Sequence, residues 1–429
     1  MLRRLLIIVA IVCSAQSLLQ AEDWPQWRGP NRDGVWSETG VVEKFAAKRL
    51  EPKWRVPIGS GYTGPTVANG LVYVMDRQTE PKQIERVLCF DSATGAQKWV
   101  QTYDCVYKNV GYEAGPRASV TIDHGRAYAL GSMGHLHCYD AKTGVVLWTR
   151  DCGDLYDIDM PIWGIAAAPL IYQDLVIVHI GGKQACVVAL NKQTGDEVWK
   201  ALDDRGQYSS PVLIKQGDRD VVLVWTGDSI AGLGAADGKV FWRIAWKPRN
   251  MPIGVPTPVI SKDRALFVSF YDGTTLLKLS QTHPAAEILW QRVGRSERDT
   301  DALQGIISTP VIQGDYIYGV DSYGELRCLD LKTGDRVWED LTAVPKARWS
   351  TIHFVKNGER YWMFNERGEL LIATLSPDGF HEISRTKVLE PTTAQLSLRG
   401  GVCWSHPAFA ERCLFARNDQ ELVCVDLAE

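Results

Sequence analysis

Short runs of alternating apolar and polar residues recur along most of this chain, and glycine interrupts them about every dozen residues. Alternation with a period of two is typical of half-buried strands, whereas stacked helices would place apolar residues at i, i+3, i+4 and i+7. The chain is also rich in turn formers, with 38 Gly and 20 Pro. The pattern therefore predicts an all-β protein.

One phrase recurs within this pattern: a strand ends near Ala or Cys, an Asp-x-x-Thr-Gly turn follows, and a second strand is closed by Trp. It occurs at residues 89–99, 138–148, 189–199 and 328–338, and in a degenerate form at 233–242. Successive closing tryptophans are roughly 40–50 residues apart, which is the period of four-stranded propeller blades.

Each residue type in the phrase has a structural reason. The Asp side chain can accept a backbone N–H of the turn, the Gly can adopt positive φ, and the Trp can pack between neighbouring blades. Because the set recurs, we interpret it as architecture and not as a row of metal sites. The repeat residues predicted in this way are Asp91, Gly95, Trp99, Asp140, Gly144, Trp148, Gly195, Trp199, Trp242, Asp330, Gly334 and Trp338.

Eight apolar stretches open with a small residue followed by Pro or its equivalent, and they align as the innermost strands of eight blades. They begin at Gly64, Ser119, Ala168, Ser210, Thr257, Thr309, Thr351 and His406. The last blade ends near Asp426 without a closing Trp, whereas Trp54 lacks a preceding turn phrase. We therefore predict an eight-bladed β-propeller of four-stranded antiparallel blades over residues 51–429, in which the N-terminal strand completes the C-terminal blade.

The first fifty residues differ from the repeat. Residues 1–21 carry two arginines, an apolar run over 5–12 and a small-residue end, which predicts a secretory signal peptide too short for a permanent anchor. Lipidation at Cys13 would split the apolar run, so we expect a soluble exported protein without a transmembrane segment after cleavage, and a lipoprotein is the alternative. Residues 22–50 are rich in Trp, Pro and Gly, and we expect this arm to pack along the propeller surface.

The Ala/Cys-x-Asp-x-x-Thr-Gly-x-x-x-Trp phrase resembles the pyrroloquinoline-quinone (PQQ)-like propeller repeat, over about residues 51–429. Two kinds of protein share that repeat, whose fold is called quinoprotein alcohol dehydrogenase-like. Quinoprotein dehydrogenases hold the quinone and calcium at the propeller centre, whereas the BamB-like scaffold of the outer-membrane barrel-assembly machinery is non-catalytic. The arm resembles that of exported planctomycete-type propellers.

The residues favour the scaffold over the dehydrogenase. The vicinal Cys-Cys pair on which that resemblance would stack the quinone is missing, as is the haem motif Cys-x-x-Cys-His. Calcium needs six to eight oxygen ligands, and the acidic and amide candidates fall mostly in turns, where such residues are expected anyway. These candidates are Asp159, Asp228, Asp272, Asp301, Asp321, Asn365 and Asn418. We predict no catalytic residues, metal site or cofactor, and a PQQ- and calcium-dependent dehydrogenase of an alcohol or sugar remains the alternative.

Other chemistry is weakly represented. The formal net charge of −4 does not favour nucleic-acid binding. The motifs Gly-x-Ser-x-Gly and His-Glu-x-x-His and a Walker loop are missing from the sequence. His135 and His137 alternate on one strand without a third ligand at metal-site spacing, so we interpret them as strand residues.

Nine of the ten cysteines follow the leader. Those at the repeat position, Cys89, Cys138, Cys328 and Cys424, are expected to fill small buried sites. Two pairings are open in an oxidising compartment, Cys105 with Cys152 and Cys403 with Cys413.

The propeller face on which the inner strands begin is the predicted binding surface. Residues two or three positions before the strand-start Pro or its equivalent are Tyr62, Arg117, Ala166, Tyr208, Pro256, Ile307, Trp349 and Trp404, with Trp163, Gln304 and Arg399 nearby. Tyr, Trp and Arg are typical of protein interfaces, and would also suit a sugar or peptide; packing within the funnel is the alternative. From this ring we select Tyr62, Arg117, Trp163, Tyr208, Gln304, Trp349 and Trp404 as candidate binding residues. We predict a monomeric scaffold that is periplasmic or extracellular and binds a protein partner, with association to the outer membrane left open.

Overall fold

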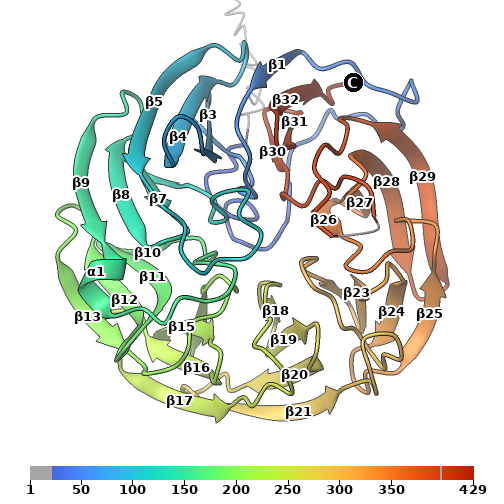
Figure 1. Cartoon of the computed structure of the whole chain (residues 1–429). Helices are drawn as coiled ribbons and strands as arrows, with labels where there is room; N and C mark the ends of the chain where they lie inside the picture. Colours follow the sequence, from blue (N-terminus) through green and yellow to red (C-terminus); the bar gives the residue numbers. More distant parts are fainter. Residues whose placement is uncertain (1–21, 397–398) are drawn as a thin grey trace, which may run out of the picture.

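Eight antiparallel sheets of four strands each are arranged as blades around a central axis (Figure 1). This computed structural model describes residues 22–396 and 399–429, so the predicted leader lies outside the described residues. The predicted eight-bladed all-β propeller is confirmed. The described residues contain one short helix, α1 (Cys152–Tyr156), and no helix among them is both long and apolar enough to cross a membrane.

The first four blades follow one another in the chain, each running from the innermost to the outermost strand. Blade 1 consists of β2 (Thr66–Ala68), β3 (Leu71–Gln78), β4 (Ile84–Asp91) and β5 (Gln97–Asp104). Blade 2 consists of β6 (Thr121–Asp123), β7 (Arg126–Leu130), β8 (His135–Asp140) and β9 (Val146–Asp151). Blade 3 consists of β10 (Leu170–Tyr172), β11 (Leu175–Gly182), β12 (Ala185–Asn191) and β13 (Glu197–Ala201). Blade 4 consists of β14 (Val212–Gln216), β15 (Arg219–Trp225), β16 (Ser229–Gly234) and β17 (Val240–Ala245).

The next blades repeat this order, and the last one borrows a strand. Blade 5 consists of β18 (Val259–Ser261), β19 (Arg264–Ser269), β20 (Gly273–Leu279) and β21 (Ala286–Arg292). Blade 6 consists of β22 (Val311–Gln313), β23 (Tyr316–Val320), β24 (Leu326–Asp330) and β25 (Arg336–Asp340). Blade 7 consists of β26 (Ile352–Asn357), β27 (Arg360–Asn365), β28 (Glu369–Ser376) and β29 (Gly379–Lys387). Blade 8 consists of β30 (Ala408–Ala410), β31 (Cys413–Arg417), β32 (Glu421–Asp426) and β1 (Trp54–Pro57).

The two ends of the propeller close the ring as predicted. Strand β1 pairs antiparallel with β32, with Trp54 opposite Cys424. The innermost strand β2 contacts both β6 and β30, so the first blade meets its neighbours on both sides. Each predicted inner strand is present, which confirms the alignment on small residues and Pro.

The repeat residues join neighbouring blades where the Trp and the glycine of the next turn are both present, as blades 1 and 2 show. The Trp99 indole N–H donates to the Ala141 carbonyl at 3.0 Å. The ring lies on Gly144, whose φ is +74° and where a Cβ would lie 2.6 Å from the indole. Asp140 holds that turn by accepting the Thr143 N–H at 2.8 Å. The same Trp-on-Gly contact recurs at Trp54 on Gly95, Trp148 on Gly195, Trp199 on Gly238 and Trp290 on Gly334.

Blade 4 departs from this rule. The Trp242 indole donates instead to the Gln216 amide oxygen within its own blade, at 2.8 Å. The following turn, between β20 and β21, lacks the Thr-Gly step on which an indole could lie. Because the turn of blade 5 is degenerate, Trp242 bonds within blade 4 and not to the next blade.

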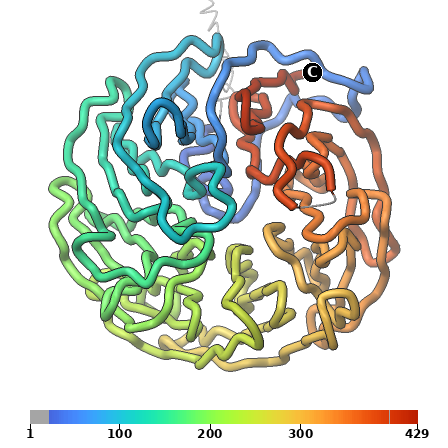
Figure 2. Tube along the Cα trace, in the orientation of Figure 1, coloured from blue at the N-terminus to red at the C-terminus, as the bar shows by residue number. Residues whose placement is uncertain are grey.

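The N-terminal arm enters the central channel (Figure 2, blue). This differs from the prediction that the arm packs along the propeller surface. Trp24 exchanges two backbone hydrogen bonds with Val67 of β2, and the Pro25 carbonyl accepts from Ile122 of β6. Further along, Trp36 donates its backbone N–H to Lys356 of β26. The arm thus binds the innermost strands of blades 1, 2 and 7, and Trp24 and Trp36 are almost fully buried.

Arg32 is the most central charge of the arm. Its guanidinium donates to the carbonyls of Ala168 and Pro211, at 3.3 and 3.2 Å, and also to that of Pro169. Its Nε donates to Gln26 at 2.8 Å. Burial lowers the pKa of this guanidinium to about 9. Arg32 therefore satisfies carbonyls of blades 3 and 4 that open toward the channel.

The nine described cysteines are all buried and free. Those at the repeat position are fully buried, which confirms that they fill small sites in the core. Neither of the open pairings, Cys105 with Cys152 or Cys403 with Cys413, is present in the structure.

Candidate functional site

An aromatic pocket opens at the centre of the face on which the inner strands begin. Its cavity volume is about 120 Å³, which is below the roughly 300–1,000 Å³ of drug-sized small-molecule sites. Seven Trp and Tyr side chains line it, together with smaller apolar residues, Arg117 and His406. The aromatic residues are Trp27, Tyr62, Tyr112, Trp163, Tyr208, Trp349 and Trp404.

Propeller symmetry explains why residues far apart in the chain meet here. Residues just before each inner strand lie at the same level around the axis. Tyr62, Arg117, Ala166, Tyr208, Ile307, Trp349 and Trp404 all line the pocket, as does Trp163. At the blade 5 position, Val255 lines it in place of its neighbour Pro256.

The aromatic rings pack against each other around the pocket. Trp163 stacks on Tyr208 with ring centroids 5.0 Å apart and meets Trp349 edge-on at 5.7 Å. Trp349 also lies 6.3 Å from Trp404. Such contacts fix the orientation of the walls before anything binds.

Arg117 is the one cationic side chain among the described lining residues, and its donors are already used. Its two terminal nitrogens donate to the carbonyls of Gly111, Tyr112 and Gly115 and to the Ser132 hydroxyl. The guanidinium therefore holds the loop at residues 111–117, and it has little capacity left for an anionic ligand.

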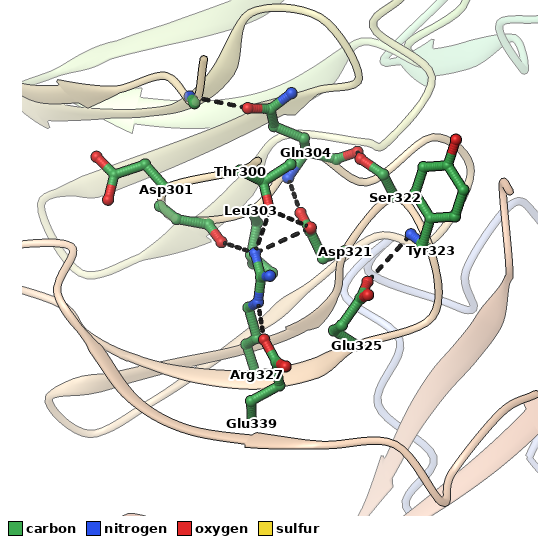
Figure 3. Close-up of polar contacts among 12 residues, drawn as sticks. Thr300, Asp301, Leu303, Gln304, Asp321, Ser322, Tyr323, Glu325, Arg327 and Glu339 are labelled. Carbon is green, nitrogen blue, oxygen red and sulfur yellow. Dashed lines mark hydrogen bonds and ion pairs between the residues drawn. The ribbon is translucent and has the colours of Figure 1, made fainter. Parts of the chain in front are cut away.

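Gln304 is placed apart from this lining. Its side chain is buried, accepts the Gly294 N–H at 2.8 Å and donates to the Phe270 carbonyl at 2.9 Å. Figure 3 shows it above Asp321, which accepts the Gln304 backbone N–H and pairs with Arg327. The structure thus gives Gln304 a part in fixing the connection between blades 5 and 6.

The Arg399 side chain is also largely buried and does not line the pocket. It pairs with the buried carboxylate of Glu366 and donates to the Arg348 carbonyl. Burial raises the pKa of Glu366 to about 7, against the opposing effect of the Arg399 charge.

The turn carboxylates considered for calcium are scattered around the ring. Asp228 pairs with Arg205 at 2.7 Å, Asp301 with Arg292 at 2.7 Å, and Asp321 with Arg327 at 2.9 Å (Figure 3). Of the others, Asp272, Asn365 and Asn418 are bonded within their own neighbourhoods, and Asp159 is exposed. Within the described ranges, no group of three or more His, Cys, Asp or Glu side chains is arranged to hold a metal.

Two buried histidines lie beneath the pocket. His406 lines it, its ring centroid is 4.8 Å from that of His353, and its Nε2 has no hydrogen-bond partner. His353 Nε2 lies 2.9 Å from the Trp404 carbonyl. Burial lowers the pKa of His353 to about 4. Burial, together with the neighbouring His353, lowers the pKa of His406 well below its usual value.

These histidines predict acid sensitivity. The unfolded chain binds more protons than the native one between about pH 6.5 and 4, so the free energy of unfolding falls as the pH drops through that window. For His353 alone the loss is about 2–3 kcal/mol by pH 4.5. Urea titrations of wild type and His353→Gln over pH 4.5–8 should show a shallower slope for the variant. The comparison at pH 8, where both rings are neutral, isolates the structural cost of the change. Equal slopes would contradict this prediction.

Sequence reasoning missed Tyr112 and Trp27, which line the pocket from segments outside the repeat. Trp27 comes from the arm and donates its indole N–H to the Thr257 hydroxyl at 2.8 Å. Tyr112 comes from the long connection between blades 1 and 2. The sequence feature that could have indicated Trp27 is the clustering of Trp and Arg within the Pro- and Gly-rich arm. This composition suits a buried segment better than one lying on the surface.

The comparisons with known proteins decide the family. The family model described as outer membrane protein assembly factor BamB matches residues 85–340, which is more than half of the chain. This chain belongs to that family. Outer membrane protein assembly factor BamB of Moranella endobia is 23% identical over 51% of this chain and 55% of its own length. The quinoprotein ethanol dehydrogenase of Pseudomonas aeruginosa is 30% identical over 43% of this chain and 32% of its own length.

Solved structures of both kinds share the fold. BamB from Moraxella catarrhalis superposes with a TM-score of 0.58 at 15% identity, covering 88% of this chain and 99% of that structure. A europium-containing methanol dehydrogenase gives 0.62 at 14% identity, covering 94% and 89%. The chain spans about half the length of the curated BamB proteins it matches, and about a third of the ethanol dehydrogenase. Within the family, fold alone does not separate scaffold from enzyme.

The pocket residues do not fit PQQ with calcium. The quinone carries three carboxylates, yet the cation at the pocket is committed to backbone carbonyls. Of the carboxylates considered for calcium, Asp228, Asp301 and Asp321 are paired with arginines, and none of those considered lines the pocket. Neither the charge of the cofactor nor its metal is matched by the donors of this site.

Proposed function

We propose that this BamB-family chain is an exported, non-catalytic propeller that binds a protein partner of the cell envelope through its aromatic pocket. One observation supports this most: seven aromatic side chains converge on the funnel mouth, while the guanidinium beside them is committed to its own loop. Trp and Tyr are enriched at the hot spots of protein interfaces, and charged residues are depleted at interface cores. The names of its BamB relatives, which describe assembly factors, point the same way.

The quinoprotein relatives motivate the second candidate, a PQQ- and calcium-dependent dehydrogenase. It would require Arg117 to release its carbonyl partners and a calcium site to form from carboxylates now paired elsewhere. We propose a cofactor-free, monomeric scaffold instead, located in the periplasm or outside the cell, with outer-membrane association as one form of that location.

Site-specific crosslinking tests this proposal. A photoreactive residue at Ile307, in the pocket wall, should capture one defined envelope protein, and purified partner should reproduce the adduct. The same residue at Val146, which is exposed on outer strand β9, is the matched control and should not capture it. Trp404→Ala should reduce capture at least tenfold, since truncation of a hot-spot residue commonly costs about 2 kcal/mol or more. Equal capture at both positions, or capture insensitive to Trp404, would contradict the proposal.

A further inference from the structure

Tyr112 occupies the middle of the aromatic pocket. Its ring centroid lies 5.6 Å from that of Trp163, 5.8 Å from Trp349 and 6.1 Å from Trp404. The side chain comes from the connection between β5 and β6, which is anchored at one end by Tyr107 and at the other by Arg117. The Tyr107 hydroxyl donates to Glu85, and the Arg117 guanidinium grips the backbone at residues 111–115.

The backbone at this contact is unusual on both sides. Tyr112 has a φ of +53° and Trp349 a φ of +64°. Bulky side chains rarely adopt this left-handed region, and they keep it only where the surroundings impose it. Two aromatic residues with strained backbones therefore contact each other within the pocket.

The pocket keeps polar capacity that Tyr112 does not use. The Trp349 and Trp404 indole N–H groups and His406 Nε2 are all buried and without hydrogen-bond partners. Buried polar atoms are normally paired, so three such atoms on lining residues leave hydrogen-bonding capacity for a ligand group that both donates and accepts. Among the described lining residues, the charged side chain is Arg117, and its donors are already used, so the lining does not favour an ionic ligand.

We propose that the pocket is a receptor for a neutral aromatic side chain of a partner peptide, and that Tyr112 occupies this place in the free protein. The proposal rests on the proposed function and specifies which partner group binds. A peptide aromatic residue supplies a flat ring for the Trp163, Trp349 and Trp404 walls and a backbone amide for the unpaired polar atoms. Tyr112 then acts as an intramolecular competitor. The apparent affinity of the pocket for the peptide is reduced in proportion to the fraction of molecules in which Tyr112 leaves the pocket free.

The probe is N-acetyl-phenylalaninamide, titrated against the purified mature protein by saturation-transfer NMR. Tyr112→Ala is expected to bind it about tenfold more tightly than wild type, since the competitor is removed. Tyr112→Phe keeps the ring and should match wild type. Tyr112→Gly, which suits a φ of +53°, should behave as the alanine variant, and provides the test if that variant does not fold.

Three further binding experiments define the class of ligand. Adding Trp404→Ala to Tyr112→Ala should remove binding of the amide. Neither methyl glucoside nor N-acetyl-lysinamide should bind Tyr112→Ala; preferential binding of either would replace the aromatic-peptide assignment with a sugar or a cation. Affinity for the phenylalanine amide that is unchanged between wild type and both small-residue variants would overturn the proposal.

The two hypotheses fail in different ways. If Ile307 captures a partner while the amide does not bind any variant, the aromatic-receptor inference is wrong and the scaffold stands. If the amide binds as expected but Ile307 captures nothing that Val146 does not, the pocket is a receptor and the envelope-scaffold function is wrong.

Discussion

Replacing Arg32 with alanine is expected to destabilise the protein by about 3 kcal/mol and to release the arm from the channel. The guanidinium satisfies the carbonyls of Ala168, Pro169 and Pro211, which belong to two different blades. Without it these carbonyls face a buried space, and an unsatisfied buried acceptor costs about 1–3 kcal/mol. At pH 7 the side chain remains charged despite burial, because its pKa is lowered only to about 9.

Urea unfolding gives the loss of stability, and limited trypsin digestion reports release of the arm. Arg32→Ala should be cleaved after Arg28, which is buried in the wild-type protein, under conditions in which wild type is resistant at that bond. Arg55→Ala is the matched control, because its guanidinium pairs with Glu421 and is largely exposed; its effect should stay within about 1 kcal/mol. A stability equal to that of wild type, with the arm still protected, would show that the arm does not depend on this contact.

Gly144→Ala is expected to be among the most damaging changes within the repeat, with a loss of about 3–4 kcal/mol. The added Cβ would lie 2.6 Å from the Trp99 indole, at a φ of +74°. The indole cannot move without breaking its bond to the Ala141 carbonyl and losing contact with the next blade. Backbone strain and steric displacement therefore act together.

Gly125 separates these two contributions, because it has a φ of +75° and an added methyl group there would meet no atom within 4 Å beyond its chain neighbours. Gly125→Ala in the same blade should cost only the conformational part, about 1–2 kcal/mol. Thermal and urea unfolding of both variants provide the comparison. Equal losses would mean that the Trp-on-Gly contact adds nothing to the junction between blades.

The sequence predicts those features that the repeat dictates. Trp99, Gly144 and Asp140 recur at fixed spacing, so the blade, its turn and its junction follow from the pattern. The pocket wall is predicted in the same way, since Tyr208 and Trp404 hold equivalent positions before their inner strands. Circular symmetry turns a fixed distance in sequence into a common place in space.

What escapes prediction lies outside the repeat. Tyr112 lies on a long connection between two blades, and Trp27 and Arg32 lie in an arm without periodicity. Their partners are single backbone carbonyls and ring faces, for which the sequence carries no signature. Gln304, selected for its nearness to the strand start, is committed to the buried contacts shown in Figure 3.

The funnel is proposed as a protein-binding pocket and not as a quinone site. The most direct test is a titration of the purified mature protein with PQQ and Ca²⁺, followed by melting temperature and tryptophan fluorescence, because a ligand bound by the native state alone raises apparent stability. We predict no saturable change in either signal at high micromolar quinone. Saturable one-to-one stabilisation would contradict the proposal and favour the quinoprotein dehydrogenase.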